Sequence, residues 1–328
     1  MNKYNYQYNV AKQAVESKSS KVVIALAPSA GKTTISHHIA NMLKGKKVLF
    51  VAHGQTLLKN QYLEELKKPN VEINFTWGTL NANVDLEVMI MQNVDQIIKT
   101  YDVVIVDEAH QFYGTNTYNK IIAKVRPSKQ ILMTGSPAKF NGKKEYDIIS
   151  ISPELLAKRG VYSELEIDLL KVNSEDFQHQ LMAIQSCLNK LKKDKILIMA
   201  PSVEYAKKLC AGLKERKIGV STSSDSQNEV IKAYINGELD TLVVVNKGVL
   251  GFNDPNTTVA IDLKGSYNLE TTFQFLARVL RKKDNCVKKY IRMTLVQDVK
   301  KQYDFIKLLK STFKQPIFGK YTDNKFKA

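Results

Sequence analysis

The sequence predicts an α/β protein made of two units in tandem, each a mostly parallel sheet flanked by helices. Short apolar runs of strand length alternate with segments whose apolar residues recur at helical spacing, and this alternation is typical of parallel sheets. The same rhythm starts a second time near Lys195. The length of 328 residues is large for one domain and ordinary for two.

The first unit is expected to hold four strands with helices between them. The strands are predicted from apolar runs over 21–27, 47–52, 101–107 and 130–134. After the first strand, apolar residues recur at helical spacing from Ile35 to Leu43, and Gly45 is a typical helix stop. A further helix is predicted through Leu57 and Leu66, after the second strand.

The second unit repeats this pattern without close repetition of sequence. Its strands are predicted over 195–200, 218–222, 241–245, 258–263 and 289–296. Its helices are predicted over 203–213, 229–235, 270–280 and 299–309. The seam is expected near residues 158–163, where KRGVYS precedes the strand-like LEIDLL. The two domains are therefore assigned to residues 1–162 and 163–328.

The composition excludes several classes of protein. No apolar run approaches the roughly 18–20 residues of a membrane helix, and the polar N-terminus lacks the apolar segment of a signal peptide. Cys187, Cys210 and Cys286 are scattered and form no CxxC pair, which argues against disulfides and structural zinc. We expect a soluble protein of the cytoplasm, or of the host cytoplasm if the chain is viral, with no membrane partner.

The charge balance favours a polyanionic partner, nucleic acid before a membrane surface. The chain has 49 Lys and Arg against 32 Asp and Glu, which gives a net charge of +17. From Arg278 onward, 15 basic residues face four acidic ones, so the C-terminal stretch is strongly basic. A solvated, lysine-rich surface is the alternative explanation, because only six of the 49 basic residues are arginines.

A candidate phosphate-binding loop leaves the first strand and enters a helix. It consists of Ser29, Ala30, Gly31, Lys32, Thr33 and Thr34. Loop amides and a helix N-terminus bind an anionic phosphate, a lysine reaches the β and γ oxygens, and a hydroxyl holds Mg²⁺. The match to the G-x-x-x-x-G-K-[ST] pattern is imperfect, because Leu26 occupies the first glycine position.

Two carboxylates follow the strand over residues 101–107. Asp107 and Glu108 are expected at the carboxyl edge of the sheet, beside the phosphate loop. Phosphoryl transfer to water needs one acid to hold Mg²⁺ and another to orient and deprotonate the water. The alternative is an acidic surface pair at the end of a core strand.

A pair of arginines in the second unit forms the third motif. Arg278 and Arg281 are three residues apart, so we expect them on one face of a helix; Gln274 begins the same motif. A guanidinium grips phosphate oxygens through two parallel hydrogen bonds, which a lysine cannot do. A solvated helix face is the alternative. Arginines of the second unit could complete an ATP site held by the first.

These motifs together resemble those of superfamily 2 helicases and translocases. In order, the chain shows the phosphate loop, Asp-Glu-Ala-His, Thr-Gly-Ser-Pro, Gly-Phe-Asn-Asp-Pro and Gln-x-x-Ala-Arg-x-x-Arg, between about Tyr6 and Arg281. The Ser-Ala-Gly-Lys form of the loop is similar to that of phage recombination helicases, which migrate branched DNA. The resemblance implies two RecA-like domains, with ATP and Mg²⁺ in the cleft between them and nucleic acid across the top.

The resemblance also implies roles for residues of the first domain. Lys32 would bind the β and γ phosphates, Thr33 and Asp107 would hold Mg²⁺, and Glu108 would activate water. Gln7, 25 residues before Lys32, lies about where the family has its adenine-reading glutamine, although a helix-surface amide is an equal alternative. Three residues would couple the nucleotide state to the domain interface: His110, Thr134 and Ser136.

Further roles follow from the resemblance for the second domain and for the strand contacts. Three residues would close on the γ-phosphate, with the last as the arginine finger: Gln274, Arg278 and Arg281. Nucleic acid would contact loops after the strands, through His53, Thr56, Ser202, Asn246 and Lys247, largely without reading the bases. Two departures from the family lie in this half: Asn253 replaces an aspartate and Ala277 a glycine.

We therefore expect an ATP-dependent helicase or translocase with DNA favoured over RNA, acting as a monomer or with partner proteins of a replication or recombination complex. Three alternatives stay open. The chain could be a motor subunit of a nuclease or recombination complex, an ATP-gated clamp or annealing protein, or an RNA helicase. The aromatic residues Trp77, Phe112, Tyr113 and Phe140 could stack on bases, although such residues more often fill a core.

Overall fold

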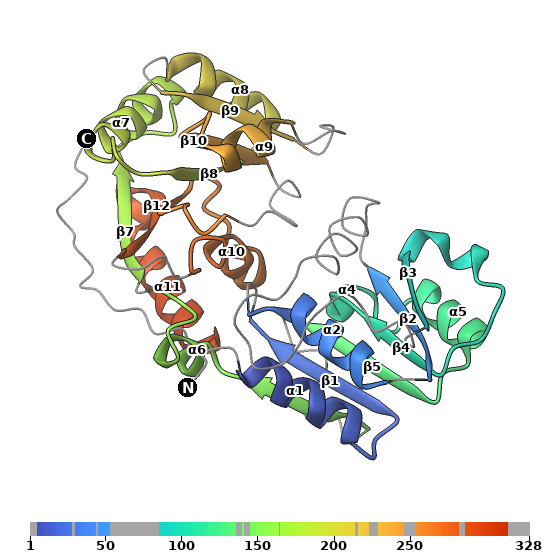
Figure 1. Ribbon diagram of the computed structural model, residues 1–328. Coiled ribbons are helices and arrows are strands. Elements are labelled where there is room, and N and C mark those ends of the chain that lie inside the picture. The colour runs from blue at the N-terminus through green and yellow to red at the C-terminus, as the bar shows by residue number, and fades with distance from the viewer. Residues whose placement is uncertain are drawn as a thin grey trace. The chain divides into compact units, whose positions relative to one another are not determined.

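The computed structural model divides into two compact units, Met1–Ser152 and Pro153–Ala328. It describes residues 5–27, 30–43, 45–52, 85–135, 140, 145–163, 165–213, 216–222, 229–245, 254–281 and 286–313. Each unit is a six-stranded parallel sheet with helices against it (Figure 1). The predicted fold class is confirmed, whereas the assignment of the domains to 1–162 and 163–328 stays a prediction.

The sheet of the first unit has the strand order β3-β2-β4-β5-β1-β6, and every neighbouring pair is parallel. Its strands are β1 (Lys21–Leu26), β2 (Lys47–Ala52), β3 (Asp85–Ile90), β4 (Val103–Val106), β5 (Lys129–Thr134) and β6 (Asp147–Ile151). The four predicted strands are present. The apolar runs do not predict β3 and β6, which lie at the two edges of the sheet, because polar residues interrupt the pattern of both strands.

Helices of the first unit pack on this sheet and connect its strands. They are α1 (Asn5–Glu16), α2 (Lys32–Met42), α4 (Ala109–Phe112), α5 (Asn116–Val125) and the 3₁₀ helix η1 (Met91–Gln96). The helix predicted after the phosphate loop is therefore α2. The helix predicted through Leu57 and Leu66 lies outside the described residues.

The sheet of the second unit has the order β7-β12-β11-β8-β10-β9, again with parallel neighbours. Its strands are β7 (Leu165–Val172), β8 (Ile196–Ala200), β9 (Ile218–Ser221), β10 (Thr241–Val245), β11 (Val259–Asp262) and β12 (Lys288–Leu295). Its helices are α6 (Pro153–Lys158), α7 (Phe177–Lys190), α8 (Val203–Gly212), α9 (Glu229–Asn236), α10 (Leu269–Leu276), η4 (Val296–Asp298) and α11 (Val299–Phe313). All predicted strands of this unit are present.

The central strands carry the hydrophobic cores. Every residue of β4, β8 and β10 is buried, as expected for parallel strands with both faces covered. Because the strands of one sheet run in the same direction, their carboxyl ends meet at one edge. In the first unit this edge brings together the end of β1, Asp107 after β4 and Thr134 at the end of β5.

Within the described residues, no helix combines the length and the apolar character needed to cross a bilayer. The same part of the chain holds no group of three or more His, Cys, Asp or Glu side chains that could bind a metal ion.

Two adjacent histidines are buried on α2, which packs against α1. The ring of Tyr8 meets the ring of His38 edge-on, with centroids 5.7 Å apart. Burial lowers the pKa of His37 to about 3, with a further lowering from His38. Burial alone lowers the pKa of His38 to about 4. Both rings are therefore neutral in the folded chain at physiological pH.

We predict that acid destabilises the first unit through these two rings. Both pKa values are lower in the folded state than the ordinary value of 6.5, so the unfolded chain takes up protons first as the pH falls. The stability that depends on neutral rings is therefore complete above pH 6.5 and is lost as the pH falls towards 4. Each histidine contributes a loss of about 1.4 kcal/mol per pH unit in this window. Urea unfolding at several pH values measures the slope.

The double substitution His37→Asn with His38→Gln should flatten this slope between pH 6.5 and 5. His179→Gln is the matched control, because the His179 side chain on α7 is 68% exposed. An unchanged slope in the double variant would contradict the prediction.

Candidate functional site

An ion pair at the carboxyl edge of the first sheet joins the phosphate loop to the carboxylates after β4. Lys32 is the first residue of α2, and its Nζ lies 3.1 Å from Oε1 of Glu108. The two side chains are 11% and 25% exposed, so the pair is screened only in part. The tertiary structure thus brings together two predicted residues that are 76 positions apart in the chain.

Two side chains of α1 hold the phosphate loop in place through hydrogen bonds. The Tyr6 hydroxyl donates a hydrogen bond to the Ala30 carbonyl oxygen at 2.5 Å, and Gln7 Nε2 donates to the same oxygen at 3.4 Å. Gly31 has φ +82°, and a Cβ atom added there would lie 2.1 Å from Gln7 Nε2. The loop therefore needs glycine both for its left-handed backbone and for the close approach of Gln7.

Thr33 and Thr34 lie in the first turn of α2 and are partly exposed. The Thr33 carbonyl accepts a hydrogen bond from the Ser36 hydroxyl at 2.7 Å. Ser29 lies outside the described residues. Of the six predicted loop residues, five are therefore placed, and all five lie at or next to the N-terminus of α2.

Glu108 adopts a backbone conformation that is rare for a residue with a side chain. Its φ and ψ are 47° and 42°, in the left-handed region. Its amide donates to Oδ1 of Asp107 at 2.9 Å, and the Asp107 amide donates to the Val51 carbonyl on β2. This sharp turn ends the strand and presents the two carboxylates at the sheet edge. Strain of this kind is common at functional sites.

The carboxylates of Asp107 and Glu108 lie close enough for one charge to affect the ionisation of the other. Burial raises the pKa of Asp107 to about 6, and the Glu108 carboxylate adds to the increase. The Lys32 ammonium opposes it, as does the hydrogen bond from the Glu108 amide. A nearby cation would lower this pKa again by favouring the ionised carboxylate.

His110 links the acidic turn to β5. Its Nδ1 lies 3.0 Å from the Thr134 hydroxyl and 3.5 Å from Oε2 of Glu108. His110 and Thr134 are both buried. Two of the three predicted coupling residues are therefore in contact with each other and beside Glu108, whereas Ser136 lies outside the described residues.

The arginine motif of the second unit differs from the expected helix. The predicted helix over 270–280 is too long, since α10 ends at Leu276. Arg278 lies in the turn that follows, and Arg281 forms an antiparallel bridge with Tyr162. The expectation that both arginines share one helix face is therefore wrong. Gln274 is on α10, as expected.

Tertiary packing explains the early end of α10. Val279 and Leu280 are buried, and the Leu280 carbonyl accepts a hydrogen bond from the Ser163 amide at 2.8 Å. A continued helix would direct the Leu280 carbonyl along the helix axis, where the Ser163 amide could not reach it. The segment before β7 thus captures the chain, so that Arg278 lies in a turn and Arg281 in a bridge rather than both on a helix.

One predicted nucleic-acid contact can be placed. The Ser202 hydroxyl follows β8 and accepts a hydrogen bond from the Tyr205 amide at 3.1 Å, so it caps α8. His53, Thr56, Asn246 and Lys247 lie outside the described residues, as do Asn253 and Trp77.

Of the described aromatic candidates for base stacking, Phe140 is buried in the first unit, and Phe112 and Tyr113 are partly buried against the same core. Phe140 is buried, and its ring meets those of Tyr113 and Tyr146 at 5.3 and 5.5 Å between centroids. Tyr113 also contacts Tyr118 at 4.9 Å. The core explanation therefore holds for Phe140 and accounts for the packing of Tyr113.

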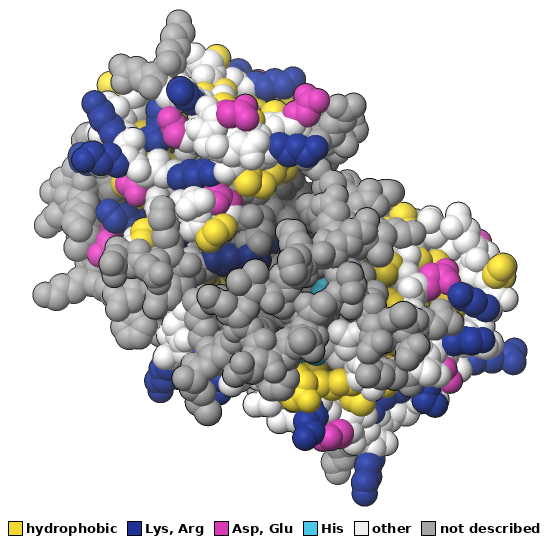
Figure 2. Space-filling model, in the orientation of Figure 1, with side chains coloured by type: hydrophobic (Ala, Val, Ile, Leu, Met, Phe, Trp, Pro, Cys, Tyr) yellow, Lys and Arg dark blue, Asp and Glu magenta, His cyan; other side chains and the backbone are white. Residues whose placement is uncertain are grey.

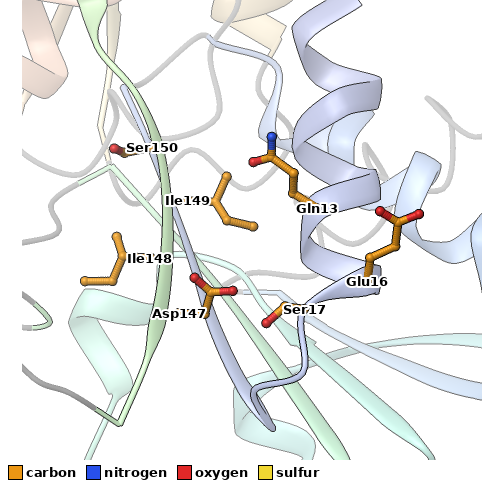
Figure 3. Close-up of a pocket in the computed structure, with 7 residues that line it drawn as sticks. All are labelled: Gln13, Glu16, Ser17, Asp147, Ile148, Ile149 and Ser150. Carbon is orange, nitrogen blue, oxygen red and sulfur yellow. The ribbon is translucent and has the colours of Figure 1, made fainter.

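A shallow hollow of about 520 Å³ borders the edge strand of the first sheet (Figure 3). It is lined by Gln13, Glu16, Ser17, Asp147, Ile148, Ile149 and Ser150. Glu16 and Ser17 lie at the C-terminal end of α1, and Asp147 begins β6. None of the predicted site residues lines this hollow.

Tyr6 is a site residue that the sequence analysis missed. Its hydroxyl holds the Ala30 carbonyl directly, and the side chain is 2% exposed. The available signal was its position next to Gln7 in a region that otherwise carries no motif. Nothing in the local sequence shows that the tyrosine faces the loop.

Two family models match the chain. The model described as type III restriction enzyme, res subunit, matches residues 1–139, and the helicase conserved C-terminal domain matches residues 179–283. A 51.5 kDa protein of a Lactococcus phage is 23% identical over 291 residues, which cover 79% of this chain and 62% of the relative. The chain thus spans about three fifths of the length of that curated relative.

Solved structures share the fold. Dbp5 of S. cerevisiae, bound to RNA and ADP BeF3, has a TM-score of 0.67 at 10% identity, covering 99% of this chain and 94% of that one. The ATP-dependent type ISP restriction-modification enzyme LlaBIII, bound to DNA, has a TM-score of 0.66 at 15% identity, covering 90% of this chain and 27% of that one. Both likenesses support a pair of RecA-like domains.

We predict that Gly31→Ala disables the loop. The left-handed backbone costs an alanine about 1–2 kcal/mol, and the added methyl group also displaces the Gln7 amide. Affinity for an ATP analogue, measured by fluorescence titration, should fall at least about tenfold because the loop amides move.

The substitution Gln7→Ala, added to Gly31→Ala, separates the backbone strain at residue 31 from the steric conflict with the Gln7 side chain. In the double variant Gly31→Ala with Gln7→Ala the steric conflict is absent, and only the backbone strain stays. Affinity in the double variant should remain low. Full recovery would show that the conflict with Gln7, rather than the backbone conformation, governs the loop.

Proposed function

The chain belongs to superfamily 2 of the helicases, and from this premise we propose that it is an ATP-driven motor that moves along DNA. The observation that carries the proposal is the group formed by Lys32, Asp107 and Glu108 at one sheet edge. An ammonium, a hydroxyl-bearing helix N-terminus and two carboxylates are the groups that a magnesium–nucleotide complex requires.

The residues fit this cofactor. Gly31 leaves the loop open to a phosphate, and Lys32 would exchange Glu108 for the β and γ oxygens. Thr33 and Asp107 would hold Mg²⁺, which supplies charge neutralisation of the phosphates when bound.

Glu108 would act as the proton acceptor. In the nucleotide-free chain its Oε1 is paired with Lys32 and its Oε2 lies near His110. Transfer of Lys32 to a phosphate would release Glu108 to orient and deprotonate a water molecule. This change would be transmitted to the domain interface through the coupling residues His110, Thr134 and Ser136.

The second unit would supply Gln274, Arg278 and Arg281 to the bound triphosphate. A bridge anchors the Arg281 backbone to Tyr162, so this residue starts from a defined position. We propose that it stabilises charge on the γ-phosphate during hydrolysis. Nucleic acid would favour the conformation in which this contact forms.

Two observations favour DNA. The restriction-enzyme model matches the first unit, and LlaBIII is bound to DNA, although Dbp5 is bound to RNA. The net charge of +17 supports a phosphate backbone as partner. Lys and Arg side chains lie across the described surface of both units in Figure 2. Strand contacts through His53, Thr56, Ser202, Asn246 and Lys247 would be largely independent of sequence.

A motor subunit of a nuclease or recombination complex is the second candidate. The match to a subunit of a restriction enzyme favours it. Such a subunit would show DNA-stimulated ATPase activity but weak strand separation alone, whereas an independent monomeric helicase would unwind forks by itself. In both cases the protein would work in the cytoplasm, or in the host cytoplasm if the chain is viral like its phage relative.

The test is steady-state ATPase activity with no nucleic acid and with single-stranded DNA, duplex DNA, a four-way junction or single-stranded RNA, at low and moderate salt. We expect at least about tenfold stimulation by one DNA form, weakened by salt. Stimulation by RNA alone would reassign the substrate, and no stimulation by any of them would contradict the motor.

Glu108→Gln should bind ATP and lose at least about a hundredfold in kcat, because an amide cannot accept the proton from water. Lys32→Ala is the companion variant and should instead weaken ATP binding. Equal kcat in wild type and Glu108→Gln would remove Glu108 from the reaction.

Arg281→Ala should bind ATP nearly as the wild type does and lose the stimulation by DNA, since the guanidinium is needed only during hydrolysis. Arg126→Ala is the matched control: Arg126 follows α5 in the first unit and lies outside the proposed machinery. Retained stimulation in Arg281→Ala would refute the proposed role of this arginine.

A further inference from the structure

A buried ion pair lies beneath the loop that leads into α10. Asp262 ends β11, and Arg292 is its register partner on β12. Their side chains are fully buried, with Arg292 Nη1 2.8 Å from Oδ2 of Asp262. The Tyr290 hydroxyl donates to the same oxygen at 2.8 Å. The pair sits at the carboxyl edge of the second sheet.

Both members of the pair also hold the loop over residues 263–268. The amides of Lys264 and Gly265 donate to Oδ1 of Asp262 at 3.0 and 3.1 Å. Arg292 Nη2 donates to the Ser266 carbonyl at 2.6 Å. Gly265 has φ +60°, so the turn is tight enough to bring these groups over the pair.

A third contact ties the same guanidinium to α11. Arg292 Nε donates to Gln302 Oε1 at 2.5 Å, and Gln302 Nε2 donates to the Tyr267 hydroxyl at 3.0 Å. The rings of Phe305 and Tyr267 lie 4.6 and 5.6 Å from the guanidinium carbon. Arg292 thus connects two strands, a helix and the loop through one planar group.

The loop passes directly into α10. The Asn268 side chain accepts a hydrogen bond from the Thr271 amide at 2.8 Å and caps the helix. The Ser266 carbonyl, already bound by Arg292, also accepts from the Thr272 hydroxyl at 3.3 Å. The start of α10 is therefore tied to Arg292 through Ser266.

We propose that Arg292 is a positioning residue, which together with Asp262 sets the place of α10 and hence of Gln274, Arg278 and Arg281. This inference rests on the proposed function. A buried ion pair contributes little to stability compared with apolar residues of similar volume. Here the pair serves to fix the orientation of its neighbours. The planar, charged guanidinium donates hydrogen bonds to the loop, to β11 and to α11 at the same time, and so holds them in one arrangement.

Arg292→Lys is the decisive variant. A lysine can meet Asp262 but cannot also span Ser266 and Gln302. The DNA-stimulated kcat should fall at least about tenfold while KM for ATP stays within about threefold. Hydrogen exchange of the amides over residues 264–276 should become faster, with the core strands β8 and β10 unchanged.

Arg216→Lys is the matched control in the same unit. Arg216 is also nearly buried, pairs with Asp240 at 2.8 Å and donates to the carbonyls of Leu191 and Asp194, but it has no tie to α10. It should keep kcat near the wild-type value. An equal loss of kcat in both variants, or a normal kcat in Arg292→Lys, would overturn the proposal.

A second variant guards against misfolding. Asp262→Leu with Arg292→Met replaces the pair by apolar residues, and it should unfold cooperatively yet show the same low kcat and fast exchange over 264–276. Normal kcat in this variant would equally overturn the proposal. If the wild type shows no stimulation by nucleic acid, the proposed function fails, and basal kcat with the exchange data then decides whether Arg292 positions α10.

Discussion

Parallel pairing of β1, β4 and β5 is the constraint on which the candidate site depends. Because these strands run in one direction, the loop after β1, the carboxylates after β4 and Thr134 at the end of β5 reach the same edge. The strands are buried on both faces, so the polar groups accumulate at their ends. An apolar core thereby places charged groups next to one another without burying them completely.

Two of the ion pairs in the described residues differ in environment and therefore in the role that we propose for them. The pair between Lys32 and Glu108 is partly exposed, and in the proposed function each residue would find a new partner when a nucleotide binds. The pair between Asp262 and Arg292 is fully buried, and its side chains make six further hydrogen bonds within the unit. The pair of Lys32 and Glu108 is therefore suited to an exchange of partners, whereas the pair of Asp262 and Arg292 is suited to holding its neighbours in a fixed position.

Local strain and tight packing coincide at the phosphate loop. Gly31 is left-handed beneath the Gln7 amide, and Glu108 adopts the same conformation despite its side chain. Both residues lie between a strand and the helix that follows it: Gly31 between β1 and α2, and Glu108 between β4 and α4. Tyr6 and Gln7 support the loop from α1, which links the N-terminal helix to the candidate site as well as to the core.

The apolar runs and the helical segments between them predict the α/β class and every strand except β3 and β6, the edge strands of the first sheet. They do so because a parallel strand that is buried on both faces appears in the sequence as a short apolar run. The order of motifs predicted the resemblance to helicases and gave Lys32, Asp107 and Glu108 as candidate site residues. Only the tertiary structure decided that α10 ends at Leu276, because the Ser163 amide that captures the chain lies more than a hundred residues away. It also decided the network around Arg292, since a buried charge is recognised by what surrounds it and not by its neighbours in the chain.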